Sequence, residues 1–71
     1  MSIEITSPLA GTIYKILIKV GDMVNEDDDV IIVEALKMEN TIYAPSSGIV
    51  KEIKVNEGDR VDDEQALAII E

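Results

Sequence analysis

The chain has 71 residues, enough for one small domain but too few for a substrate cleft with its own core beneath it. It contains no cysteine, histidine or tryptophan, which removes disulfides, thiolate nucleophiles, imidazole bases and the usual zinc ligands. The formal net charge of −9 argues against binding to nucleic acid or to an anionic membrane. No apolar run approaches the roughly 20 residues of a membrane helix, so we expect a cytoplasmic protein without direct membrane insertion.

A repeat organises the chain. Shifting the sequence by 37 positions superimposes two similar halves, each reading Pro-x-x-Gly, an alternating apolar segment, Gly-Asp-x-Val, an acidic loop and an aliphatic run. The matched residues are Pro8 with Pro45, Gly11 with Gly48, Ile16 with Ile53, Gly21-Asp22 with Gly58-Asp59, Val24 with Val61, and Ile32 with Ile69.

The apolar patterns predict strands throughout. Apolar and other residues alternate with a period of two over residues 15–20 and again over 52–56. The runs 30–33 and 67–70 are short and aliphatic on both faces, as in strands buried within a small sandwich. No segment has a convincing helical period.

Glycine and aspartate mark the predicted turns. We expect all four glycines to lie at corners that require positive φ, including Gly11 and Gly48. Asp22 and Asp59 follow glycines, where a carboxylate can accept a local backbone N–H. The acidic run 26–29 lacks the ligand spacing and internal glycine of an EF-hand, so we interpret it as a turn.

Two all-β halves of this size predict a flattened β-sandwich whose four-stranded halves are related by a pseudo-two-fold axis. This symmetry places the junction between the halves, residues 33–43, at one end and the two termini near the other. The junction contains no glycine or proline, and it must form a tight hairpin near Leu36-Lys37. Such a turn prefers positive φ at its centre, for which Leu and Lys are poor choices, and this local violation marks a candidate functional site.

In this segment the chain resembles the biotinyl domain family, whose attachment motif is Ala-Met-Lys-Met. The corresponding residues are Ala35-Leu36-Lys37-Met38, preceded by Glu34 and followed by Glu39. The resemblance extends over the whole chain, including both Pro-x-x-Gly corners and both Gly-Asp turns. It departs from the motif at Leu36, which has nearly the volume of the family's methionine but lacks the thioether.

The resemblance implies that residues 1–71 form one barrel-sandwich hybrid domain, a non-catalytic carrier with biotin joined to Lys37 by an amide. A lysine amine is a poor nucleophile until its proton is removed, and the family solves this with a biotin protein ligase that presents an acyl-adenylate. Glu34, Ala35, Leu36, Met38 and Glu39 would be flanking recognition residues. The implied partners are biotin carboxylase and carboxyltransferase or decarboxylase subunits, and no metal site is expected.

Two other functions compete with this hypothesis. A lipoyl carrier shares the fold and the hairpin lysine, but that family typically places Asp before and Ala after the lysine, where this chain has Leu36 and Met38. An unmodified barrel-sandwich module could act as an assembly adaptor. Acetyl-CoA, propionyl-CoA, pyruvate, oxaloacetate and methylmalonyl-CoA systems all fit the sequence of a biotin carrier.

Overall fold

The computed structural model describes residues 2–71, so the first residue of the expected domain lies outside the described residues. In this range the predicted all-β fold is confirmed, and there is no helix long and apolar enough to span a membrane. The strands are β1 (Ile3–Thr6), β2 (Gly11–Ile16), β3 (Met23–Val24), β4 (Asp29–Ala35), β5 (Met38–Tyr43), β6 (Gly48–Ile53), β7 (Arg60–Val61) and β8 (Ala66–Ile70).

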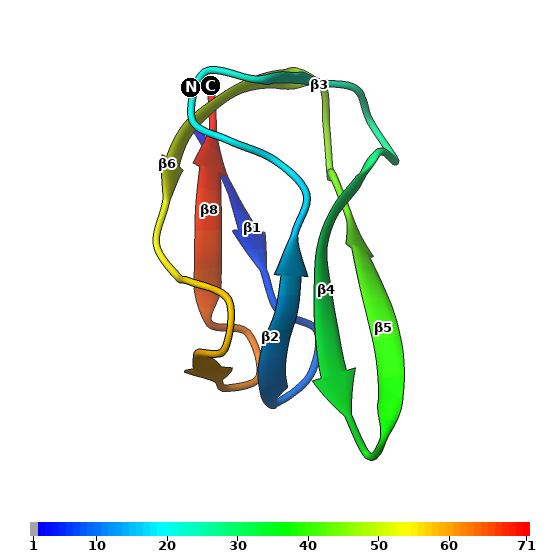
Figure 1. Cartoon of the computed structure of the whole chain (residues 1–71). Helices are drawn as coiled ribbons and strands as arrows, with labels where there is room; N and C mark the ends of the chain where they lie inside the picture. The colour runs from blue at the N-terminus through cyan, green and yellow to red at the C-terminus, as the bar shows by residue number, and fades with distance from the viewer. Residues whose placement is uncertain (1) are drawn as a thin grey trace.

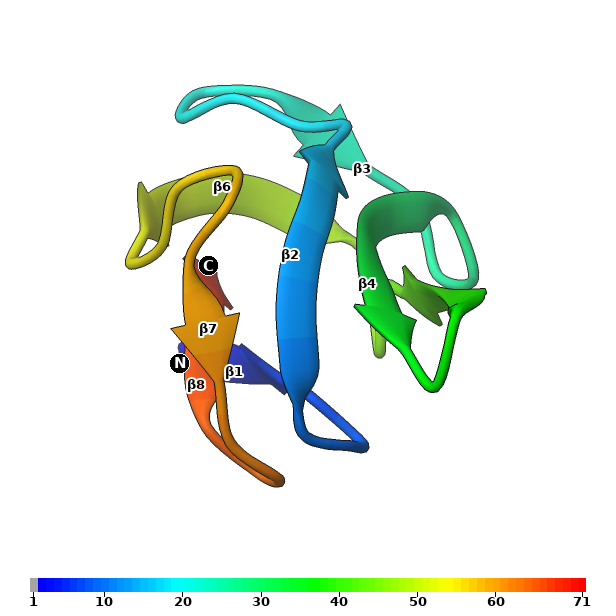
Figure 2. The same ribbon diagram turned by 60° about the horizontal axis from the view of Figure 1, so that its bottom comes forward.

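Two four-stranded antiparallel sheets form the predicted flattened sandwich, with strand orders β1-β8-β6-β3 and β5-β4-β2-β7. Each sheet takes two strands from each half of the sequence, so the halves interlock around a shared interior (Figure 2). The molecule measures 33 × 18 × 17 Å. The β4–β5 hairpin projects at one end and both termini lie together at the other, as the repeat predicts (Figure 1).

The pseudo-two-fold relation is visible in the hydrogen bonds. The N–H of Gly21 donates to the carbonyl of Val50 at 2.8 Å, and the N–H of Gly58 donates to the carbonyl of Ile13 at 2.8 Å. Each atom of the first bond lies 37 residues from its counterpart in the second. Each half therefore completes the backbone hydrogen bonding of the other, and neither could form this core alone.

The predicted aspartate turns are confirmed in both halves. Asp22 Oδ2 accepts the backbone N–H of Lys19, and Asp59 Oδ2 accepts that of Asn56, each at 2.9 Å. Gly21 and Gly58, which precede these aspartates, have φ of 96° and 93°, so the positive φ predicted for them is also confirmed.

The core between the sheets is aliphatic. In the strands β4 and β8 consecutive residues are buried, so side chains on both faces of each strand are covered, as the aliphatic runs 30–33 and 67–70 predict. Ser7 is the buried polar residue of the described chain, and its hydroxyl donates to the Leu9 carbonyl at 2.6 Å. The buried apolar residues are Ile5, Ile13, Ile18, Val24, Val30, Ile31, Val33, Ile42, Ala44, Val50, Val55, Val61, Leu67, Ala68 and Ile70.

The two alternating apolar segments of the sequence, residues 15–20 and 52–56, extend beyond the ends of the observed strands β2 and β6. The strand β2 ends at Ile16, and Leu17 makes one more bond, from its N–H to the Val30 carbonyl at 2.9 Å, before the chain turns. Ile18 is buried beneath this turn, whereas Val20 is 63% exposed. The apolar period of two therefore continues past the strand because a loop residue also reaches the core, and the same holds for Val55 after β6.

The expectation of positive φ at Gly11 and Gly48 is wrong. Among the glycines only Gly21 and Gly58 have positive φ, and Gly11 and Gly48 begin the strands β2 and β6. Close backbone approach requires these two glycines instead. A Cβ on Gly11 would lie 2.5 Å from the Glu34 carbonyl oxygen, and one on Gly48 would collide with Ile70.

Candidate functional site

The β4–β5 hairpin turns through two residues. Ala35 and Met38 are paired at the ends of the strands, so Leu36 and Lys37 form the whole loop. Their φ angles are 54° and 62°, which gives positive φ at both central positions, as in a type I′ turn. The predicted two-residue hairpin, with the lysine at its tip, is confirmed (Figure 1).

This turn is locally unfavourable. Left-handed backbone costs an ordinary L-residue roughly 1–2 kcal/mol, and both residues of the loop adopt it. Packing does not compensate, because the Leu36 residue is 95% exposed. The strand register on either side holds the turn, together with a hydrogen bond from the Asn40 side-chain amide to the Met38 carbonyl at 3.2 Å. Nothing in the sequence pattern had singled out Asn40.

The base of the hairpin is rigid because it is anchored in the core. Val33 is fully buried, and the missing Cβ of Gly11 allows β2 to pack directly against the Val33–Ala35 end of β4. The tip beyond this base is solvent-exposed on every side, and Met38 is 66% exposed. The result is a stiff stalk that presents the Lys37 side chain to solvent.

Two carboxylates lie on one face of the stalk. Glu34 and Glu39 are direct cross-strand partners and both are exposed. Like charges in this arrangement repel each other, which weakens the pairing slightly. Within residues 2–71 the ion pair is Lys51–Glu71, so neither glutamate is paired with Lys37. All six residues of the predicted attachment segment therefore lie together at one end of the molecule, with the lysine amine unobstructed.

The acidic run forms the predicted turn. Asp28 Oδ2 accepts the N–H of Asn25 at 2.9 Å, and Asp27 has a φ of 72°. Within the described range, no group of three His, Cys, Asp or Glu side chains has the geometry to hold a metal ion. This turn lies at the end opposite the hairpin (Figure 1).

Comparison with known proteins decides the family. Residues 1–70 match the biotin/lipoyl family, described as biotin-requiring enzyme. The chain belongs to this family. It is 44% identical over 59 residues to the biotin/lipoyl attachment protein of Bacillus subtilis, covering 83% of this chain and 81% of that one. It is 46% identical over 56 residues to the biotin carboxyl carrier protein of Streptococcus mutans, covering 79% and 43% respectively.

The fold of this family member recurs in solved structures. The crystal structure of urea carboxylase from Kluyveromyces lactis contains it with a TM-score of 0.92 and 36% identity, covering 99% of this chain and 6% of that one. The chain likewise spans only 10% and 9% of two mitochondrial methylcrotonoyl-CoA carboxylase alpha subunits that it matches. The biotin/lipoyl domain thus occurs as a small part of much larger carboxylases.

Proposed function

We propose that this domain is a biotin carboxyl carrier and that Lys37 is its attachment residue. One observation carries the proposal: in a member of the family of biotin-requiring enzymes, a solvent-exposed lysine occupies the tip of a stiff hairpin whose backbone is strained at that residue. Strain that serves neither packing nor hydrogen bonding is typical of a functional position.

The residues around Lys37 fit a long acyl substituent. Leu36 leaves the amine open because its own side chain contacts almost nothing, and the buried base of β4 fixes the point of attachment. Amide formation joins the lysine nitrogen to the biotinyl carbonyl, the adenylate leaving group departs as AMP, and the nitrogen loses a proton to solvent or ligase. When bound, biotin supplies a ureido nitrogen that accepts and releases a carboxyl group.

The protein's contribution is positional. A stalk of fixed length keeps the end of the arm at a high local concentration in each active site on which the domain docks. We infer a non-catalytic, cytoplasmic carrier that serves biotin protein ligase, biotin carboxylase, and a carboxyltransferase or decarboxylase. Glu34 and Glu39, which are exposed and take no part in the ion pair found within residues 2–71, would be recognised by the ligase together with Ala35, Leu36 and Met38.

The experiment is an intact-mass measurement on protein purified from its native cell. We expect the mass of one biotinyl group, located on Lys37 by peptide mapping, and recognition by labelled avidin. The formal charge should change from −9 to −10, because one ammonium becomes a neutral amide. Lys37→Arg is the matched control: it keeps the charge and should be unlabelled. A lipoyl mass would identify the lipoyl alternative, and an unmodified chain the adaptor.

A further inference from the structure

The internal repeat provides a control for surface residues. Each exposed residue of one half has a counterpart 37 positions away in an equivalent place on the same backbone. Three exposed apolar residues lie on the segment between β2 and β4 of the first half, which includes β3: Leu17 is 44%, Val20 63% and Met23 76% exposed. Ile49 of β6, 39% exposed, is the cross-strand partner of Met23 and adds to this surface. We call these four residues the apolar loop surface.

The counterparts of all four are polar. Lys54, Glu57 and Arg60 occupy the positions of Leu17, Val20 and Met23 in the second half, and Thr12 occupies that of Ile49. Thr12 and Arg60 are also a cross-strand pair, as Ile49 and Met23 are. The fold at these positions therefore has no requirement for apolar side chains. A single exposed apolar residue needs no explanation, but four on one segment and its paired strand, all with polar counterparts, indicate an interaction surface.

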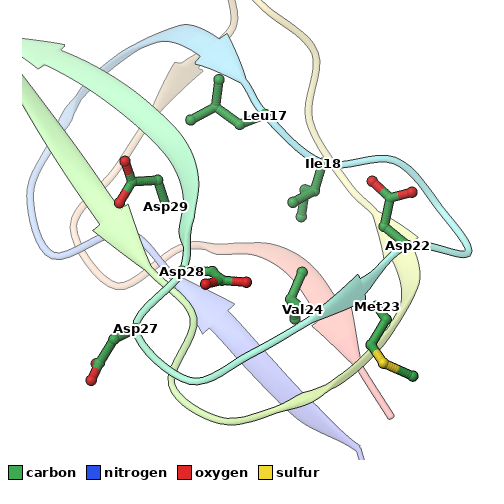
Figure 3. Close-up of a pocket in the computed structure, with 8 residues that line it drawn as sticks. All are labelled: Leu17, Ile18, Asp22, Met23, Val24, Asp27, Asp28 and Asp29. Atoms are coloured by element: carbon green, nitrogen blue, oxygen red, sulfur yellow. The ribbon is translucent and has the colours of Figure 1, made fainter.

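The apolar loop surface borders a cavity. Leu17 and Met23 line a hollow of about 460 Å³, whose floor is formed by the buried side chains of Ile18 and Val24 (Figure 3). This volume is in the range of a small-ligand pocket or a few side chains of a peptide. The segments that line the hollow, residues 17–24 and 27–29, lie toward the end of the molecule that is remote from the β4–β5 hairpin (Figure 1).

The rim of the cavity is acidic. Asp22 and residues 27–29 complete its lining, and no lysine or arginine is among the residues that line it. The carboxylate of Asp28 is directed into the ring of lining side chains, whereas that of Asp27 points away (Figure 3). Asp22 and Asp28 each use Oδ2 in a local turn, which leaves Oδ1 available to an incoming donor.

We propose that the apolar loop surface and its cavity dock a short segment of a partner protein in which basic and apolar side chains are combined. Lysine or arginine side chains would enter the hollow, where four of the eight lining residues are aspartates, and apolar side chains would pack on the exposed Leu17 and Met23 beside it. A second copy of this chain is disfavoured because both copies would bring the same acidic rim. Docking here leaves the hairpin free, so the inference goes beyond the proposed function and does not depend on modification of Lys37.

The test is a titration of the isotope-labelled domain followed by amide chemical shifts. The probe is a five-residue synthetic peptide in which three lysines alternate with two leucines. We expect saturable shifts concentrated in residues 17–29 and around Ile49. A peptide of equal charge with serine in place of leucine should bind at least about tenfold more weakly, because it has no apolar side chain to pack on the apolar loop surface.

The repeat supplies matched variants. Met23→Arg introduces the counterpart residue Arg60, and we expect it to weaken binding at least about tenfold. Tyr14→Lys introduces the counterpart residue Lys51 at a position that is also exposed but does not line the cavity, and it should change binding less than about twofold. Both variants change the net charge from −9 to −8. A difference in peptide binding between them therefore cannot come from the net charge.

Three outcomes would overturn the proposal. Absence of saturable shifts would do so, as would equal binding of the serine peptide with shifts spread over the acidic loops of both halves, which indicates general electrostatic attraction. A concentration-dependent dimer in sedimentation, abolished by Met23→Arg, would assign the surface to self-association instead. Modification of Lys37 should be the same in both variants, which keeps this test independent of the carrier function.

Discussion

The two ends of the molecule are built on one plan and used differently. At the hairpin end β4 pairs with β5, and at the other end the equivalent strands β8 and β1 pair beside the termini. The terminal end has no connection between the equivalent strands. The hairpin end joins them through Leu36 and Lys37, both in left-handed conformation. A symmetric framework thus acquires its distinguishing feature through one locally unfavourable turn.

The charges differ as well. At the terminal end Lys51 Nζ lies 3.5 Å from Glu71 Oε1, an exposed ion pair worth little in stability. The equivalent positions at the hairpin end hold Tyr14 and Glu34, so Glu34 has no basic counterpart there and faces Glu39 instead. The hairpin end is therefore strained and negatively charged beneath the lysine. Stability alone favours neither property, which supports a functional origin for both.

The largest effect is expected when the lysine is moved within the turn that distinguishes the hairpin end. Exchanging Leu36→Lys with Lys37→Leu preserves composition and charge but displaces the amine by several ångströms. We expect labelling by ligase to slow at least about a hundredfold, since a misplacement of about 1 Å can have that effect. Thermal melting should match the parent. Equal labelling of the exchanged protein would show that position on the hairpin is not recognised.

Alanine at Gly11 and Gly48 tests whether the two ends are equally constrained. The Cβ of Gly11→Ala would meet the backbone oxygen of Glu34 in β4, and that of Gly48→Ala would meet the buried side chain of Ile70 in β8. Both of these strands are paired on both sides. We therefore expect destabilisation of roughly 1–3 kcal/mol at each position, measured by denaturant unfolding. A near-neutral result at either position would contradict the close packing around that glycine.

Leu36→Asn tests the strain directly. Asparagine tolerates positive φ far better than leucine, and the exposed Leu36 side chain contributes no packing that would be lost. The free energy of unfolding should therefore increase by about 1 kcal/mol, while ligase labelling becomes slower. Wild-type labelling with higher stability would mean that Leu36 is not recognised, and lower stability would contradict the turn geometry.

The smallest effect is expected from restoring the residue of the family motif. Leu36→Met should change the free energy of unfolding by less than about 0.5 kcal/mol, because the side chain lies in solvent in either case. Labelling should be unchanged or faster. Markedly slower labelling would show that the leucine, and not merely an apolar residue, is preferred by the ligase.

The sequence by itself determined the repeat, the all-β class, the aspartate turns and the two-residue hairpin at Leu36-Lys37, because each depends on local patterns and on chain length. Only the tertiary structure decided how the halves combine. The exchange of strands between sheets, the close approach that requires Gly11 and Gly48, and the cavity behind Leu17 and Met23 all arise from contacts between distant segments. A linear pattern shows that a residue is apolar, but its exposure depends on which partner covers it, and in the described structure the residues of the apolar loop surface stay 39–76% exposed.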